Sequence, residues 1–186
     1  MTRALAFVTS LALALPALSL AQDAPPPEPT APLTLPAPPA PPATYGEHDL
    51  KTLDGDTLRA NAFVRYQEGQ LEDAIQLQHW GVMAREAGGE GQYNLACFYA
   101  LAGKVDAAFY WLQRAAKDEG VDAAWAGEDS DLDALRKDPR WAKVAEHLAA
   151  WNTWWGVSGR RVTLLVVPAG VTKDAAIPAV VGLHGF

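Results

Sequence analysis

Cysteine is almost missing from this sequence, since Cys97 is the only one among 186 residues. No internal disulfide can form, so packing alone must stabilise the fold. A lone cysteine in a helical segment is more often a small buried apolar residue than a reactive thiol. Histidine is also sparse, and the four residues lack metal-ligand spacing: His48, His79, His147 and His184. The sequence therefore indicates neither a metal site nor a cofactor.

Clusters of positive charge are absent as well. The formal net charge is −7, with 15 Lys and Arg residues against 22 Asp and Glu residues. An acidic chain of this kind repels a phosphate backbone, which excludes nucleic acid as a partner.

No apolar run is a comfortable membrane span. Residues 1–21 carry one positive charge, Arg3, then an Ala-rich apolar stretch that ends in the small-x-small pattern Ser-Leu-Ala. This order is typical of a secretory signal peptide that is cleaved after Ala21. An uncleaved anchor is the alternative, although Pro16 would bend a spanning helix. We therefore predict a periplasmic or secreted protein without a stable membrane span.

Proline is concentrated in one segment. Residues 22–43 read QDAPPPEPTAPLTLPAPPAPPA, in which ten of 22 residues are proline. Such a stretch forms neither helix nor sheet and has almost nothing to bury, so it favours an extended polyproline-type spacer. A ligand for a small proline-binding domain is the alternative. We assign residues 22–53 to a proline-rich disordered linker.

The chain then contains an internal repeat. When residues 60–81 are laid over residues 94–116, small residues coincide at a constant offset of 34. The pairs are Ala62 with Ala96, Gly69 with Gly103, Ala74 with Ala108, and Gly81 with Ala115. Two amphipathic helices per unit, with glycine at the turn and small residues where the helices cross, account for this period.

The second unit resembles the tetratricopeptide repeat family. It carries the family's signature spacing at Ala96, Tyr99, Gly103, Ala108, Leu112 and Ala115. The first unit departs from that pattern, because Arg65 replaces an aromatic residue and Gln78 a large apolar one. Chance coincidence in an Ala-rich chain is the alternative explanation.

A capping element is expected, because two repeats rarely bury enough surface to stand alone. Residues 131–135 predict a short helix, and Asp138 with Pro139 predicts the start of another. Apolar residues then recur at helical spacing, at Trp141, Val144, Ala145 and Leu148. We predict a mainly α fold of tetratricopeptide-like repeats with capping helices over residues 54–151, and the stretch NTWWGVSGRR should end the helical period.

The resemblance implies that a protein or peptide partner binds in a groove lined by the first helix of each unit. The candidate groove residues are Arg59, Phe63, Tyr66, Tyr93, Asn94, Cys97 and Leu101. Asn94 stands where the carboxylate-clamp subset of the family also has Asn. Arg59 and Phe63 replace the clamp's Lys and its other Asn, which argues against capture of a C-terminal carboxylate.

Residues 160–186 predict two short strands and a turn, at most a β-hairpin. The segment resembles the entry to the α/β-hydrolase fold of esterases and dienelactone-hydrolase-like proteins, where a central strand ends in His-Gly. The resemblance implies an oxyanion loop at His184, Gly185 and Phe186. We expect the tryptophans at 151, 154 and 155 to pack against a hydrolase domain, with a carbohydrate or lipid site as the alternative.

No Gly-x-Ser-x-Gly elbow is present, and acyl transfer needs that nucleophile with a base and a carboxylate. We therefore interpret the sequence as an inactive N-terminal fragment of a serine carboxylic-ester hydrolase, which binds a partner and lacks its hydrolase domain. The alternative is a non-enzymatic repeat adaptor whose last 30 residues or so form a hairpin or a disordered tail.

Overall fold

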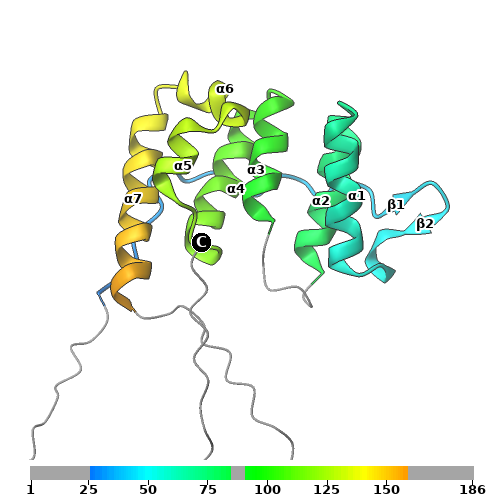
Figure 1. Cartoon of the computed structure of the whole chain (residues 1–186), viewed down its shortest axis with the longest axis horizontal. Helices are drawn as coiled ribbons and strands as arrows, with labels where there is room; N and C mark the ends of the chain where they lie inside the picture. The colour runs from blue at the N-terminus through cyan, green and yellow to red at the C-terminus, as the bar shows by residue number, and fades with distance from the viewer. Residues whose placement is uncertain (1–25, 85–90, 159–186) are drawn as a thin grey trace, which may run out of the picture.

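A computed structural model describes residues 26–84 and 91–158, and this part of the chain is mainly helical, as predicted (Figure 1). Its α-helices are α1 Gly55–Gln67, α2 Leu71–Met83, α3 Gln92–Leu101, α4 Val105–Asp118, α5 Ala123–Glu128, α6 Asp133–Arg136 and α7 Trp141–Ser158. The 3-10 turns are η1 Leu50–Thr52 and η2 Ser130–Leu132. The expected signal peptide (1–21) and the expected hairpin (160–186), with His184, Gly185 and Phe186, lie outside the described residues.

A small antiparallel sheet precedes the helices, and the sequence patterns did not predict it. Strand β1 Thr44–Tyr45 pairs with strand β2 His48–Asp49. Gly46 has φ +60°, in the left-handed region that a tight turn uses. The Tyr45 hydroxyl donates to the Asp73 carboxylate at 2.9 Å, so the hairpin is fastened to α2.

Two helix pairs have the same turn geometry. Gly69 ends the α1–α2 turn with φ 74°, and Gly103 ends the α3–α4 turn with φ 71°. The next amide in each turn closes the same long hydrogen bond, from Gln70 to the Arg65 carbonyl at 2.8 Å and from Lys104 to the Tyr99 carbonyl at 2.9 Å. This is the pattern of a Schellman-type helix end, in which glycine takes the left-handed position.

The small residues of the repeat lie at the helix crossings. Ala62, Ala74, Ala96 and Ala108 are all fully buried. Because an Ala side chain ends at Cβ, paired helices can approach closely at these positions. Both alanine pairs that are 34 residues apart in the sequence are therefore buried in the helical array.

An ion pair also recurs at the same interval. Glu72 in α2 pairs with Lys104 at 2.6 Å, and Asp106 in α4 pairs with Arg140 at 2.6 Å. Glu72 and Asp106 are 34 residues apart, and each is bound by a base from the following unit. The pairs are largely exposed, so they contribute at most about 1 kcal/mol each to the free energy of unfolding.

The segment after α4 closes the helical array. Leu132, Leu135, Val144 and Leu148 are fully buried, which joins η2, α6 and α7 to one core. The Asp138 carboxylate, three residues before the start of α7, accepts the backbone N–H of Arg140 at 2.9 Å. Asp138 therefore orients the entry to α7, close to the predicted cap position.

Helix α7 extends beyond its expected end. It continues through the stretch NTWW to Ser158, and Trp151 and Trp154 are almost fully buried within the helical array. Trp155 donates its indole N–H to the Ala116 carbonyl at 3.1 Å. The expected packing of these tryptophans thus includes contacts within the described part of the chain. Residues 148, 151 and 155 still fall on one helix face, so the helical spacing of apolar residues continues past residue 151.

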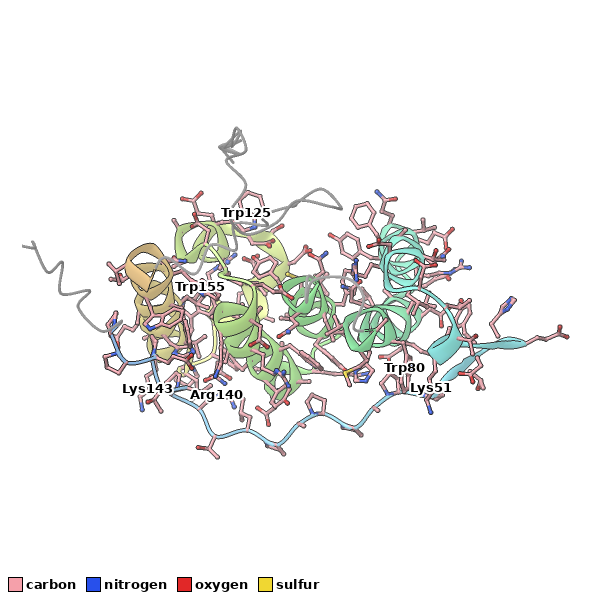
Figure 2. All side chains as sticks on the ribbon, turned by 90° about the horizontal axis from the view of Figure 1, so that it is seen from below. Lys51, Trp80, Trp125, Arg140, Lys143 and Trp155 are labelled. Atoms are coloured by element: carbon pink, nitrogen blue, oxygen red, sulfur yellow. The ribbon has the colours of Figure 1, made fainter. Side chains whose placement is uncertain are left out.

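The proline-rich segment also differs from the expected spacer. Residues 26–43 are extended, as predicted, but they lie along the helices, as Figure 2 shows. Leu33 and Leu35 pack against the core, so the segment does have apolar surface to bury. None of the helices within residues 26–84 and 91–158 combines the length and apolarity that crossing a membrane requires.

Candidate functional site

Helices α1 and α3 carry all seven predicted groove residues, but the structure divides them into three groups. Tyr66, Tyr93 and Cys97 converge on one acidic turn between α5 and η2. Phe63, Asn94 and Leu101 are exposed on the surface. Arg59 is held between α1 and α2 instead.

The acidic turn is built by Asp129 and Asp131. The Tyr93 hydroxyl donates to Asp129 Oδ2 at 2.7 Å, and the Cys97 thiol points to the same oxygen at 3.8 Å. The Tyr66 hydroxyl donates to Asp131 Oδ2 at 3.0 Å. Asp129 also accepts the Asp131 backbone N–H at 3.0 Å, which fixes the turn. The turn therefore ties α1 and α3 to the closing segment.

Sequence reasoning did not identify these two carboxylates. Asp129 lies 36 residues from Tyr93, and Asp131 lies 65 residues from Tyr66. The available signal was local, in the run Glu-Asp-Ser-Asp at 128–131, which is typical of a turn or helix cap where a helical pattern pauses.

The acidic turn suppresses ionisation of its partners. Burial, together with Asp129, raises the pKa of the Cys97 thiol above its usual value. Burial and the hydrogen bond to Asp129 likewise raise the pKa of Tyr93. For Tyr66, the hydrogen bond to Asp131 is the first cause of a raised pKa. Because a thiol reacts as its thiolate, Cys97 is held unreactive at neutral pH and acts as a packing residue.

An aromatic stack lies beside this turn. The Tyr66 ring stacks on Phe98 with centroids 5.1 Å apart, and Phe63 lies 5.8 Å from Tyr66. Phe98 is buried, whereas Phe63 is 50% exposed and Leu101, near the end of α3, is 40% exposed. We call Phe63, Tyr66, Asn94 and Leu101 the α1–α3 face. It combines exposed apolar side chains with one amide and an adjoining pair of carboxylates.

Arg59, also predicted as a groove residue, contacts α2. Its guanidinium donates to the Gly81 carbonyl at 3.3 Å and pairs with Asp56. A Cβ at Gly81 would lie 2.8 Å from Arg59 Cγ, so glycine there makes room for the arginine stem. Arg59 therefore fastens α1 to the end of α2, and this explains why the close approach needs Gly81.

The described ranges contain no group of three or more His, Cys, Asp and Glu side chains arranged to hold a metal ion. Two histidines in these ranges, His79 and His147, are buried in the helical packing. Comparisons with known protein families, with curated proteins and with solved structures found no match for this chain.

Proposed function

We propose that the chain is an exported, tetratricopeptide-type repeat protein whose α1–α3 face binds a peptide segment of a protein partner. The observation that carries this proposal is the pair Phe63 and Leu101. Both large apolar side chains are 40% exposed or more, and they stand on the first helices of successive helix pairs. Solvated apolar side chains grouped beside an aromatic stack are typical of binding surfaces.

The repeated geometry supports assignment to a repeat module. Both turns use a left-handed glycine, and the four crossing alanines are buried at matching positions. Such arrays stabilise themselves through contacts between neighbouring units and leave one continuous surface for ligands. The buried leucines of η2, α6 and α7 fit the capping role that such an array requires.

The chemistry of the face favours one kind of ligand. Asp129 and Asp131 adjoin the exposed apolar residues, and the whole chain has a net charge of −7. A ligand carboxylate would be repelled there, which agrees with the absence of the complete clamp pattern. An apolar peptide flanked by lysine or arginine would gain both apolar burial and charge complementarity.

A peptide selection with the full chain tests this function. Displayed random peptides are selected on the wild-type chain, and their affinities for the wild type and for Phe63→Ser/Leu101→Ser are measured by calorimetry. We expect the double variant to bind at least about tenfold more weakly, since removal of anchor residues costs more than about 1 kcal/mol. The matched control, Met83→Ser, changes an exposed apolar residue of α2 and should retain the wild-type affinity. Equal affinities for all three chains would contradict the proposal.

We also propose that the module belongs to an esterase-type α/β-hydrolase, on the resemblance carried by the apolar sequence that precedes His184 and Gly185. The adaptor without enzymatic ancestry is the second candidate. Sequencing the gene beyond the codon for Phe186 distinguishes them, since a Gly-x-Ser-x-Gly elbow within roughly a hundred residues supports the hydrolase.

A further inference from the structure

The opposite side of the helical array carries a second surface, formed by α2, α4 and α7. Residues 26–43 run along it, from α7 to α2, while Trp125 of α5 lies on the other side (Figure 2). The direction is opposite to the order of the helices, so the earliest described residue lies beside the last helix. The side-chain hydrogen bonds that hold this segment are made to its main-chain groups.

Helices α7 and α4 hold the first half of the segment. Trp154 donates its indole N–H to the Pro26 carbonyl at 2.8 Å. The Gln113 side-chain amide binds both main-chain groups of Leu33, accepting the N–H at 3.0 Å and donating to the carbonyl at 3.4 Å. Gln113 is only 7% exposed, so its amide is a buried polar group. The segment itself supplies its hydrogen-bond partners.

Helix α2 holds the second half in the same manner. The Trp80 indole N–H and the Gln76 amide both donate to the Pro42 carbonyl, at 2.9 and 2.8 Å. Gln76 also donates to the Thr44 carbonyl at 2.8 Å. Proline cannot donate a hydrogen bond, but its carbonyl accepts one, so donors of this kind suit a proline-rich chain.

From Leu35 to Pro41, burial along the segment has a period of three. Leu35, Pro38 and Pro41 are partly buried, whereas the two residues between each pair are exposed. Polyproline II has three residues per turn, so one edge of such a helix faces the protein at every third residue. The segment therefore presents one regular edge to α2 and α4, where Pro38 and Pro39 line a hollow with Lys104 and Ala107.

We infer that α2, α4 and α7 form a binding site for an extended proline-rich peptide, and that residues 26–43 of this chain are its occupant. The site recognises the peptide by its carbonyls and by its period-three edge, so it does not require the covalent connection. Polyproline II is already extended in the free peptide, which lowers the ordering cost of binding. The covalent connection through residues 44–54 raises the effective concentration of the segment and keeps the site filled.

Displacement and replacement of the segment in the full chain test this inference. In Leu33→Asp/Leu35→Asp, two carboxylates replace the apolar contacts, and the segment should leave its site. Nuclear magnetic resonance then follows the indole N–H signals of Trp80 and Trp154. We expect their solvent exchange to become about fivefold faster, as expected for the loss of a hydrogen bond worth roughly 1 kcal/mol. The exposed indole of Trp125 is the internal control and should not change.

A synthetic peptide with the sequence of residues 26–43 is then added to the variant. Saturable return of the Trp80 and Trp154 signals to their wild-type positions supports the inference, provided that a peptide with both leucines changed to Asp has no effect. If the variant loses its helical circular dichroism, Leu33→Ala/Leu35→Ala replaces it. The inference is overturned if the segment stays bound in the variant. It is also overturned if excess wild-type peptide fails to restore the signals, or if the peptide shifts α1 and α3 instead.

Discussion

The indole N–H of Trp154 and the carbonyl of Pro26 form a hydrogen bond of 2.8 Å that spans 128 residues of sequence. It joins the beginning of the described chain to the last helix. Because Lys117 in α4 also pairs with Glu28 at 3.0 Å, the start of the segment has two fastenings on neighbouring helices. Residues 26–43 thus cover the array on the side of α2, α4 and α7, whereas the α1–α3 face is open to solvent.

Replacing Trp154 by Phe should loosen this end of the segment. The variant keeps an aromatic ring but removes the N–H donor, so the free energy of unfolding should fall by about 1 kcal/mol. Denaturant unfolding measures that change, and limited proteolysis with mass spectrometry should find faster cleavage between residues 26 and 32. Trp125→Phe alters an exposed indole and should leave both readings unchanged. Identical cleavage in the Trp154 variant and the wild type would show that the hydrogen bond does not hold the segment.

Replacing Ala108 by Asp tests the repeat packing. Ala108 is fully buried at the crossing of α3 and α4, so the new carboxylate would be buried without a partner and should cost several kcal/mol, on the order of 3. Ala60→Asp places the same group on the exposed side of α1 and should cost less than about 1 kcal/mol. Thermal melting followed by circular dichroism compares the two. Equal melting temperatures would mean that the crossing does not depend on a small residue.

The helical architecture and its turns could be predicted from the sequence because their determinants are local. Gly69 and Gly103 allow the turn, and buried alanines occur where the turn brings helices together. The docking of residues 26–43 could not be predicted in this way. Its partners Gln113 and Trp154 lie 80 and 128 residues from the groups that they bind, and no short-range pattern connects them.

The candidate site was predictable only in part, for the same reason. The resemblance to the tetratricopeptide family placed Phe63, Tyr66 and Leu101 on the first helices of successive units, and α1 and α3 carry them. It could not show that Asp129 and Asp131 would bind the tyrosine hydroxyls, because those contacts depend on how the closing segment folds back. It also placed Arg59 at the groove, whereas Gly81 provides a nearer space for its stem.

Acid should destabilise the protein through two buried histidines. Burial lowers the pKa of His79 and of His147 below the usual 6.5, and hydrogen bonding with the backbone of Gln113 and Thr30 opposes the shift of His147. In addition, His147 Nε2 accepts the Trp151 indole N–H at 3.2 Å, which only the neutral ring can do. As the pH falls, the two histidines therefore take up protons in the unfolded chain before they do so in the folded protein. This stabilisation is complete above about pH 6.5 and is lost as the pH falls below it.

Denaturation midpoints between about pH 7.5 and pH 5 measure this effect. We expect a shallower pH dependence in His147→Gln than in the wild type. Parallel curves for the wild type and His147→Gln would show that His147 does not titrate differently on folding.

The chain should show no esterase activity. The oxyanion loop implied at His184, Gly185 and Phe186 would supply at most one donor, worth a few kcal/mol only within a complete site. No Gly-x-Ser-x-Gly nucleophile is present in the sequence. Assay with short-chain p-nitrophenyl esters should give the buffer rate for the wild type and for His184→Ala. Turnover above that rate that disappears in His184→Ala would mean that the chain holds an active site.

The most direct test of the account is to map where a partner peptide binds the full chain. The tightest peptide from the selection is titrated into isotope-labelled protein, and backbone and indole signals are followed by nuclear magnetic resonance. We expect saturable shifts of the backbone signals of α1 and α3 around Phe63 and Leu101. The indole signals of Trp80 and Trp154 should not change, because residues 26–43 still cover them. Shifts confined to Trp80 and Trp154, with none at Phe63 or Leu101, would contradict it.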